Sequence, residues 1–193
     1  MRKNKKLSRF IGIGLTVIAL ILVFFIYESI MKPIRFNNER DKRRNAVIDR
    51  LKDIRNAQIS FRNINGKYTA SFDTLIDFVQ NGQIPMIKFI ADPEDTTFTI
   101  QILDTIGYIN VRDSLFKKEN FNPKKLKFIP YSDNVEFEMD AGRTERGNVM
   151  VNVVEVFAAN KYFLKDLDDR YFDSEDGLRF GSMTDPTTDG NWE

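Results

Sequence analysis

The sequence predicts an α+β protein, in which an N-terminal transmembrane helix is followed by an amphipathic helix packed on a small antiparallel β-sheet. Three observations predict this fold class. Residues 10–27 form a run of eighteen residues without a charged side chain. Residues 39–63 repeat apolar side chains at helical spacing. From residue 83 onward, short segments alternate apolar and polar residues as strands do.

The charge-free run has the length of a membrane-spanning helix. The hydrocarbon core of a bilayer is about 30 Å thick, and a helix needs roughly 20 mostly apolar residues to cross it. Ile30 and Met31 extend the run past Glu28, so residues 10–31 are expected to form the anchor. A buried core helix is the alternative, but a soluble helix of this length carries a polar stripe and this run has none. Pro33 favours a break or bend after the anchor.

A cleaved signal peptide is a second alternative for the same run. Signal peptides have a shorter apolar core that leads to a small-x-small cleavage site. Here the run ends in Tyr27-Glu28-Ser29-Ile30-Met31, without such a site, and the chain has no cysteine for lipid attachment. The sequence therefore predicts an uncleaved signal anchor.

The flanking charges favour an N-terminus in the cytoplasm. Residues 1–9 are basic and contain no acidic residue, and the first signal usually decides the orientation. The segment after the anchor is also rich in Lys and Arg, so the two flanks differ little. We expect a single-pass protein of a bacterial inner membrane with a periplasmic C-terminal domain.

Five parts are expected along the chain, and the region after the anchor is long enough for one core. They are a basic cytoplasmic tail 1–9, the anchor 10–31, a juxtamembrane stalk 32–46, an extracytoplasmic α+β domain 47–180 and an irregular tail 181–193.

Composition narrows the classes of function. The chain has no histidine and no cysteine, which removes the usual general base, the nucleophilic triads and most zinc sites. A formal net charge of +1 gives no general attraction to nucleic acid. No motif positions a small-molecule substrate. We therefore expect a protein that is not an enzyme.

The amphipathic segment has one apolar face. Val47, Leu51, Ile54 and Phe61 follow one another at spacings of four, three and seven residues. This stripe is expected to pack on the sheet, with a short coiled coil as the alternative.

Turn signals predict a second, shorter helix. Asn65-Gly66 is a C-cap signal for the first helix. Ser71 is a candidate N-cap for a helix over residues 72–80, which Asn81-Gly82 closes.

Several short strands are expected after this helix. Asp104-Thr105 is expected to be a tight link between the first two strands, and the polar loop 140–147 connects a hairpin. Residues 160–170 are expected to form one or two helical turns. The expected strands are residues 97–103, 106–111, 126–130, 135–139, 148–157 and 178–180.

The end of the first helix carries a pattern found in one family. The residues are Ala57, Phe61, Asn65, Gly66, Tyr68 and Leu75. Their spacing resembles the A-x-x-x-(F/Y)-x-x-x-N-G-x-Y-(P/T) pattern of type IV pilins and of the pseudopilins of type II secretion, within a match of residues 54–75. The resemblance implies a pilin-like fold and contacts with other envelope proteins, as in a secretion or pilus-like assembly.

The anchor departs from that family. Pilin precursors carry a glycine followed by an aromatic residue or Met at the leader-peptidase site, and a glutamate five residues into the mature chain. Here neither Gly12 nor Gly14 is followed by such a glutamate, and Glu28 lies at the other end of the run. We therefore expect a fixed anchor and not a processed, polymerising subunit.

An acidic stretch before Gly177 is the candidate metal site. Calcium binds six to eight oxygens, which such a stretch offers, although the spacing does not match an EF-hand. Some pseudopilins hold calcium in a C-terminal loop, so the resemblance adds to the hypothesis. A solvated acidic surface is the alternative. The candidate ligands are Asp166, Asp168, Asp169, Asp173, Glu175 and Asp176.

Smaller features each have two interpretations. Residues 142–147 are a hairpin tip or a phosphate-binding loop, and Trp192 tucks the tail onto the domain or anchors a partner. Glu136 and Glu138 are a solvated strand face or a pair of hydrolase carboxylates. A membrane-tethered module that senses a ligand or calcium is accordingly the alternative function, and an enzyme that uses carboxylates alone is the third.

Overall fold

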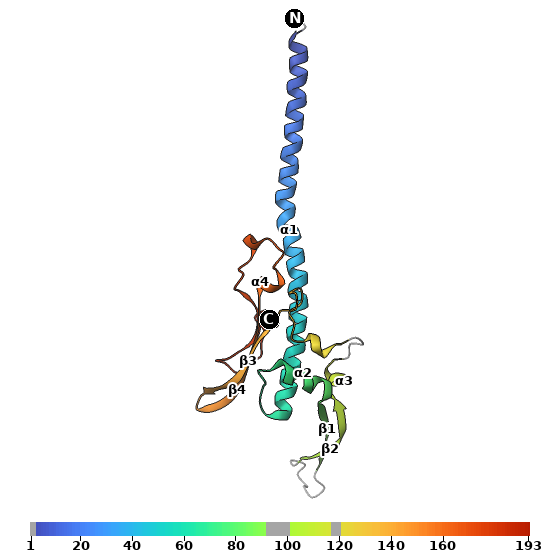
Figure 1. Ribbon diagram of the computed structural model, residues 1–193, viewed down its shortest axis with the longest axis vertical. Helices are drawn as coiled ribbons and strands as arrows, with labels where there is room; N and C mark the ends of the chain where they lie inside the picture. The colour runs from blue at the N-terminus through green and yellow to red at the C-terminus, as the bar shows by residue number, and fades with distance from the viewer. Residues whose placement is uncertain (1–2, 92–100, 117–120) are drawn as a thin grey trace. The chain divides into compact units, whose positions relative to one another are not determined.

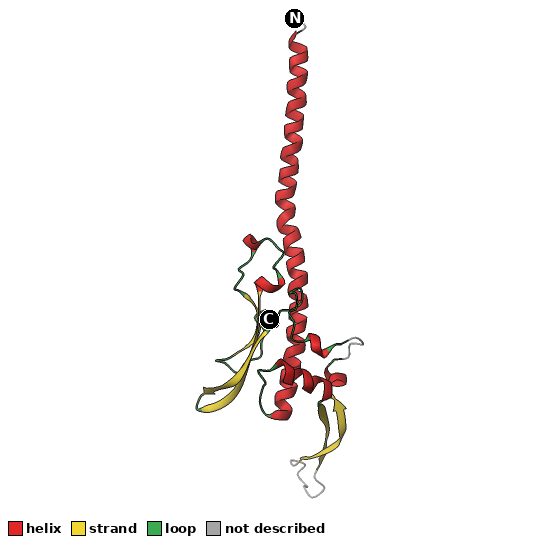
Figure 2. Ribbon diagram, in the orientation of Figure 1, coloured by secondary structure: helices red, strands yellow, loops and turns green. Residues whose placement is uncertain are grey.

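The computed structural model describes residues 3–91, 101–116 and 121–193 (Figures 1 and 2). The chain divides into two compact units, Met1–Lys42 and Arg43–Glu193. The fold class is α+β, as predicted: a long helix with an apolar N-terminal part is followed by small antiparallel sheets.

The first unit is helical throughout its described residues. Helix α1 begins at Lys3, ends at Asn65 and continues through Pro33. Of the break or bend expected at Pro33, a break therefore does not occur. A long helix can retain one proline at the cost of the single hydrogen bond that the missing N–H would make.

The apolar surface of this unit is open. Phe10, Leu20 and Phe25 are each exposed by more than half of their surface, and no part of the most apolar 18-residue window is buried. Within the described residues this helix alone is long and apolar enough to cross a membrane, and an N-terminal signal sequence can also contain such a helix. An apolar surface of this extent is unusual for a protein that faces only water.

In the second unit, one face of α1 forms a wall of the core. Val47, Leu51, Ile54 and Ala57 are fully buried, and Phe61 is 8% exposed. These residues belong to one core together with residues from the sheet, so the predicted stripe packs within its own domain.

The turn that ends α1 was predicted from local sequence and is confirmed. Gly66 has φ +72°, and its N–H donates to the Arg62 carbonyl at 2.8 Å. Helix α2, Phe72–Asn81, then begins with Ser71 as its N-cap, whose side chain accepts from the Thr74 N–H. The α2 residues buried in the core are Phe72, Leu75, Ile76 and Val79.

A three-stranded antiparallel sheet lies beside the second half of α1 (Figure 1). Its strands are β3 (Glu138–Arg146), β4 (Val149–Ala159) and β5 (Gly177–Ser182), in the order β3-β4-β5. The strand residues in the core are Val154, Val156, Ala158, Leu178 and Phe180.

A separate two-stranded sheet pairs β1 (Gln83–Ala91) with β2 (Gln101–Asn110). The remaining elements are short, and they are α3 (Val111–Leu115), the 3-10 helix η1 (Pro123–Lys125), α4 (Asn160–Phe163) and the 3-10 helix η2 (Asp169–Tyr171).

Three strand predictions need correction, and part of the predicted strand 97–103 lies outside the described residues. β2 runs through Asp104-Thr105, so the tight link there is wrong, and Asp104 lies opposite Lys88. A strand over 126–130 is also wrong, because Phe128 makes only a single bridge to Glu136.

The third correction concerns the hairpin of β3 and β4, which exists but turns later than predicted. Most of the expected loop 140–147 belongs to β3, and the turn is Gly147-Asn148, with φ of 57° and 63°. A polar strand is possible here because the residues from Gly142 to Arg146 are exposed or half-buried and none of them enters the core.

The C-terminal tail has little regular structure, but it is held in place along β5. The Gly181 N–H donates to the Asp189 carbonyl at 2.9 Å, and the Asn191 N–H donates to the Arg179 carbonyl at 3.0 Å. Arg55 of α1 binds the Glu193 carboxylate at 2.7 Å and lies over the Trp192 ring. Of the two interpretations of Trp192, these contacts favour the tucked tail.

We predict that acidification releases the tail. The hydrogen bond from Arg55, and secondarily the Gly190 N–H, lowers the pKa of Glu193. A lowered carboxyl pKa stabilises the docked tail above the ordinary pKa of glutamate, about 4.3, and this stabilisation is lost as pH falls through the lower value. Trp192 is the single tryptophan, so its emission should shift to longer wavelength in that pH range.

The matched control is Glu193→Gln, which removes the titrating group. Its tryptophan emission should lack this step. An identical step in the variant would show that Glu193 does not hold the tail.

Replacing Gly66 should test the turn that ends α1. Gly66→Ala should lower stability by roughly 1–2 kcal/mol, because an L-residue is strained at positive φ. A Cβ there meets no atom within 4 Å, so no steric clash adds to the cost. Since 1 kcal/mol moves the midpoint of a domain of this size by about 2–4 °C, thermal unfolding of the full chain in detergent measures the effect. Gly66→Asn should lose less, and equal midpoints for all three proteins would contradict this account.

Candidate interaction surface

The β1–β2 hairpin joins the domain at its base. The Gly82 N–H donates to the Phe78 carbonyl at 2.8 Å, and the Gly82 carbonyl accepts from the Val111 N–H at 3.0 Å. A Cβ on Gly82 would lie 2.3 Å from that Phe78 carbonyl oxygen, so the junction requires glycine. From this base the two strands extend away from α2 and α3 (Figure 1).

The pairing of the hairpin explains its unusual sequence. Pro85 lies opposite Tyr108, and Met86 lies opposite Gly107. Proline lacks the donor that a central strand needs, but in a two-stranded sheet each strand is an edge strand. The register shifts after Met86, which leaves Ile106 as the extra residue of a β-bulge and increases the local twist.

The hairpin exposes large apolar side chains. Met86 is 43% exposed, Ile87 47%, Ile106 60% and Tyr108 65%. Successive strand residues point to opposite faces, so Met86 and Ile87 place apolar surface on both. Among the hairpin side chains that the structure describes, only Lys88 is charged.

Such a hairpin is poorly stabilised by itself. A two-stranded sheet without a covering layer is marginal in water, and exposed apolar patches mark binding surfaces. Both outer edges also present backbone groups to which another strand can pair. We therefore take this hairpin as the candidate interaction surface.

The sequence indicated strands in this region but did not show the surface. Pro85 concealed β1, because a proline normally argues against a strand. The available signal was the absence of acidic residues from 83 to 91 together with four large aliphatic side chains, Ile84, Met86, Ile87 and Ile90.

The six predicted calcium ligands are spread along one segment and have other contacts. Asp168 binds Arg170, Glu175 binds Lys161 at 3.0 Å, and Asp166 lies 4.0 Å from Arg43. In the described part of the chain, no group of three or more acidic residues is arranged to hold a metal ion. The calcium site therefore stays a prediction without geometric support.

The other three predicted ligands are also accounted for. Asp173 and Asp176 accept the N–H groups of Glu175 and Gly177, at 3.0 and 2.8 Å, and Asp169 is exposed at the start of η2. Asn160, which the sequence did not single out, fastens this segment by donating from its side chain to the Asp173 carbonyl at 2.9 Å.

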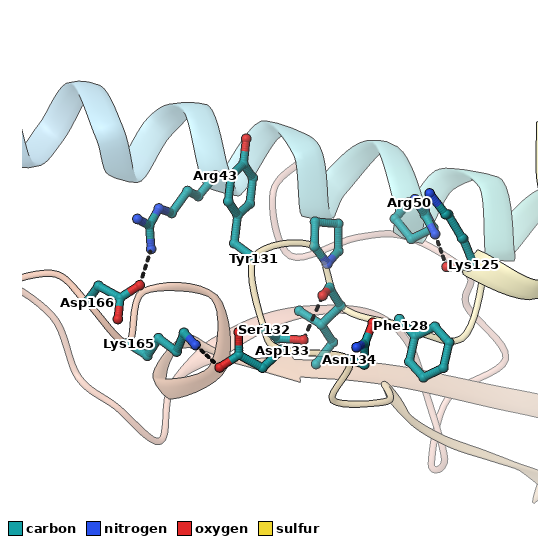
Figure 3. A pocket seen from close by; sticks show the side chains of 12 residues that line it. Arg43, Arg50, Lys125, Phe128, Tyr131, Ser132, Asp133, Asn134, Lys165 and Asp166 are labelled. Atoms are coloured by element: carbon teal, nitrogen blue, oxygen red, sulfur yellow. Dashed lines mark hydrogen bonds and ion pairs between the residues drawn. The ribbon is translucent and has the colours of Figure 1, made fainter. Parts of the chain in front are cut away.

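A polar hollow of about 390 Å³ is lined by α1 and the loop before β3 (Figure 3). Three of the four cations that line it are engaged: Arg43 donates to the Phe163 carbonyl at 3.1 Å, Arg50 donates to the Lys125 carbonyl, and Lys165 binds Asp133. Burial lowers the pKa of Arg50, and the charge of Asp53 partly offsets this. The polar groups here hold the loop against the helix, so we assign the hollow no ligand.

The remaining candidates have structural roles. Residues 142–147 form the outer part of the β3–β4 hairpin, where Arg146 pairs with Asp185 at 2.6 Å. Glu136 pairs with Lys127 at 2.6 Å, and this bond raises the pKa of the lysine. Neither feature gathers groups for catalysis.

Comparisons with known proteins gave no match: no family model, no curated protein and no solved structure matches this chain. The resemblance to pilins therefore stays a prediction.

Calcium addition tests the acidic stretch directly. Because Asp168 and Glu175 hold cationic side chains, we predict that calcium leaves the thermal midpoint of the full chain in detergent unchanged. A saturable rise with calcium, absent with magnesium and lost in Asp173→Asn, would restore the metal site.

Proposed function

We propose that this is a single-pass membrane protein of the bacterial envelope that acts by binding another protein and not by catalysis. Residues 10–31 are its anchor, the N-terminus lies in the cytoplasm, and the domain lies in the periplasm. The β1–β2 hairpin is the surface that binds the partner.

The anchor assignment rests on the exposed apolar helix. Its 18-residue apolar window has no buried part. Exposing such a surface to water costs free energy. In a bilayer each apolar side chain contacts lipid, and the helix satisfies the hydrogen bonds of its own backbone N–H and C=O groups. The charge-free run and the basic residues 1–9 support the proposed orientation.

The exposed hairpin is the single observation that carries the binding function. Among the hairpin side chains that the structure describes, Ile106 and Tyr108 are the most exposed apolar ones, at 60% and 65%. A protein partner that covers both strands would supply the missing layer and bury this surface, and aromatic side chains are enriched among residues that dominate binding energy.

A partner within the same envelope fits this surface. The two strands of the hairpin carry one positive charge, Lys88, and one negative charge, Asp104, which lie opposite each other, so they contribute little long-range electrostatic attraction to the encounter. Confinement to one membrane raises the effective concentration of two anchored partners. A secretion or pilus-like assembly, which the resemblance to pilins implies, is the kind of complex in which such a subunit would act.

Site-specific photo-crosslinking should identify the contact. We replace Tyr108 with a photoreactive phenylalanine in the full chain, irradiate intact cells and purify under denaturing conditions. The proposal predicts a discrete adduct with one protein, which is lost when Ile106→Ser is added. The matched control carries the probe at Gln80, an exposed polar residue of α2, and should give no such adduct.

Ile106→Ser should leave stability nearly unchanged, because substitutions of exposed residues typically alter it by about 0.5 kcal/mol or less. A loss of the adduct can then be assigned to binding. Adducts with lipid alone, or the same adduct from Gln80, would contradict a protein-binding hairpin.

A further inference from the structure

Strand β3 is an edge strand with available backbone groups. It pairs with β4 on one side, through a register that includes Arg146↔Val149 and Gly142↔Val153. Because Arg146 and Val149 flank a two-residue turn, they form a hydrogen-bonded pair, and such pairs recur at every second residue. The backbone groups of Ala141, Arg143 and Glu145 therefore face the other edge.

The two outer edges of this sheet differ in how many of their backbone groups are hydrogen-bonded. On β5 the tail residues Asp189 and Asn191 occupy the edge through backbone hydrogen bonds. On the outer edge of β3, which faces away from β4, only the Ala141 N–H has a partner within the described chain, the Asp140 carboxylate at 2.8 Å. The segment from the Ala141 carbonyl to the Glu145 N–H is open for pairing.

A groove of about 600 Å³ runs beside this open edge. One side is the end of α1 and the loop after it, and the other side is the outer half of β3 and β4. The lining residues used below are Lys67, Thr69, Arg143 and Asn152. Its volume lies within the range of about 300–1,000 Å³ that is typical of ligand sites.

Hydrogen bonds fix both walls of the groove. The Asn152 side chain donates to the Gly66 carbonyl at 2.8 Å, which links β4 to the loop. Gln58, fully buried, donates to the Thr69 carbonyl at 2.6 Å and accepts from the Thr69 N–H at 3.2 Å. The groove is thus formed before any ligand enters, which reduces the ordering cost of binding.

The groove is positively charged. Lys67 and Arg143 line it, and no Asp or Glu does. Arg143 donates to the Asn152 side chain at 3.3 Å, and neither cation pairs with a carboxylate in the described chain. This distinguishes the groove from the hollow of Figure 3, where Lys165 pairs with a carboxylate.

We propose that an extended acidic segment of a partner protein binds here by adding a strand to β3. Its backbone pairs with the stretch from Ala141 to Glu145, and its carboxylates meet Lys67 and Arg143. Main-chain pairing of this kind supplies affinity, and the charges select the sequence. This site is separate from the β1–β2 hairpin and does not depend on the function proposed for it.

Peptide binding to the full chain in detergent tests the proposal. The probe is a fluorescein-labelled octapeptide of alternating threonine and glutamate, and its binding is measured by fluorescence anisotropy at low salt. The peptide should bind, and the matching threonine–lysine peptide should not. Arg143→Glu combined with Lys67→Glu should weaken binding about tenfold or more. The charge-matched control, Lys52→Glu combined with Lys124→Glu, reverses two exposed charges that do not line the groove and should leave the affinity unchanged.

A second probe separates strand addition from simple charge attraction. Methylating alternate backbone nitrogens of the peptide removes the donors along one edge and keeps every carboxylate. The proposal predicts loss of binding for one of the two methylation patterns. Two results would overturn the proposal: equal binding of both methylated peptides, or no binding of the acidic peptide at millimolar concentration. Dimers crosslinked through Arg143 would also overturn it, because they would show that a second copy of the chain occupies the edge.

Discussion

The buried face of α1 is the constraint on which the rest of the domain depends. Val47, Leu51, Ile54 and Ala57 lose all contact with solvent, and α2 and the β3-β4-β5 sheet complete the same core. Burying a large aliphatic side chain contributes about 1.5–3 kcal/mol, so this stripe accounts for a substantial part of the stability of a small domain. Helix α2 and the β3-β4-β5 sheet are positioned by packing in the core that this helix forms.

The two elements with proposed functions, the β1–β2 hairpin and the outer half of β3, extend outside this core. The β1–β2 hairpin is joined to the core at Gly82 and Val111 and then carries exposed Ile106 and Tyr108 into solvent. The outer half of β3 likewise passes beyond the core, which leaves its edge open beside Arg143. A stable helix-centred core with two projecting hairpins suits a protein whose work is binding, since the binding surfaces can vary without loss of the fold.

Part of this fold was predictable because it depends on interactions between residues that are close in the sequence. The helix stripe, the left-handed Gly66 and the Ser71 cap each depend on residues a few positions apart, so the sequence was sufficient to predict them. The strands depend on partners far along the chain. Asp104-Thr105 resembles a turn until Lys88 is placed opposite it, and Pro85 conceals a strand that is possible because it lies at the edge of a sheet. The candidate interaction surface was hard to predict, because the exposure of Tyr108 depends on the tertiary structure: β1 and β2 form a separate two-stranded sheet. The sequence likewise did not reveal that the cations Lys161 and Arg170 pair with carboxylates of the acidic stretch.

We propose that residues 10–31 anchor a domain that lies outside the cytoplasm. The most direct measurement uses the full chain with a C-terminal tag: membranes are extracted with alkaline carbonate, and intact spheroplasts are treated with protease. The account predicts that the protein stays in the carbonate pellet and that the tag is digested before lysis. Release by carbonate, or a tag that protease reaches only after lysis, would contradict it.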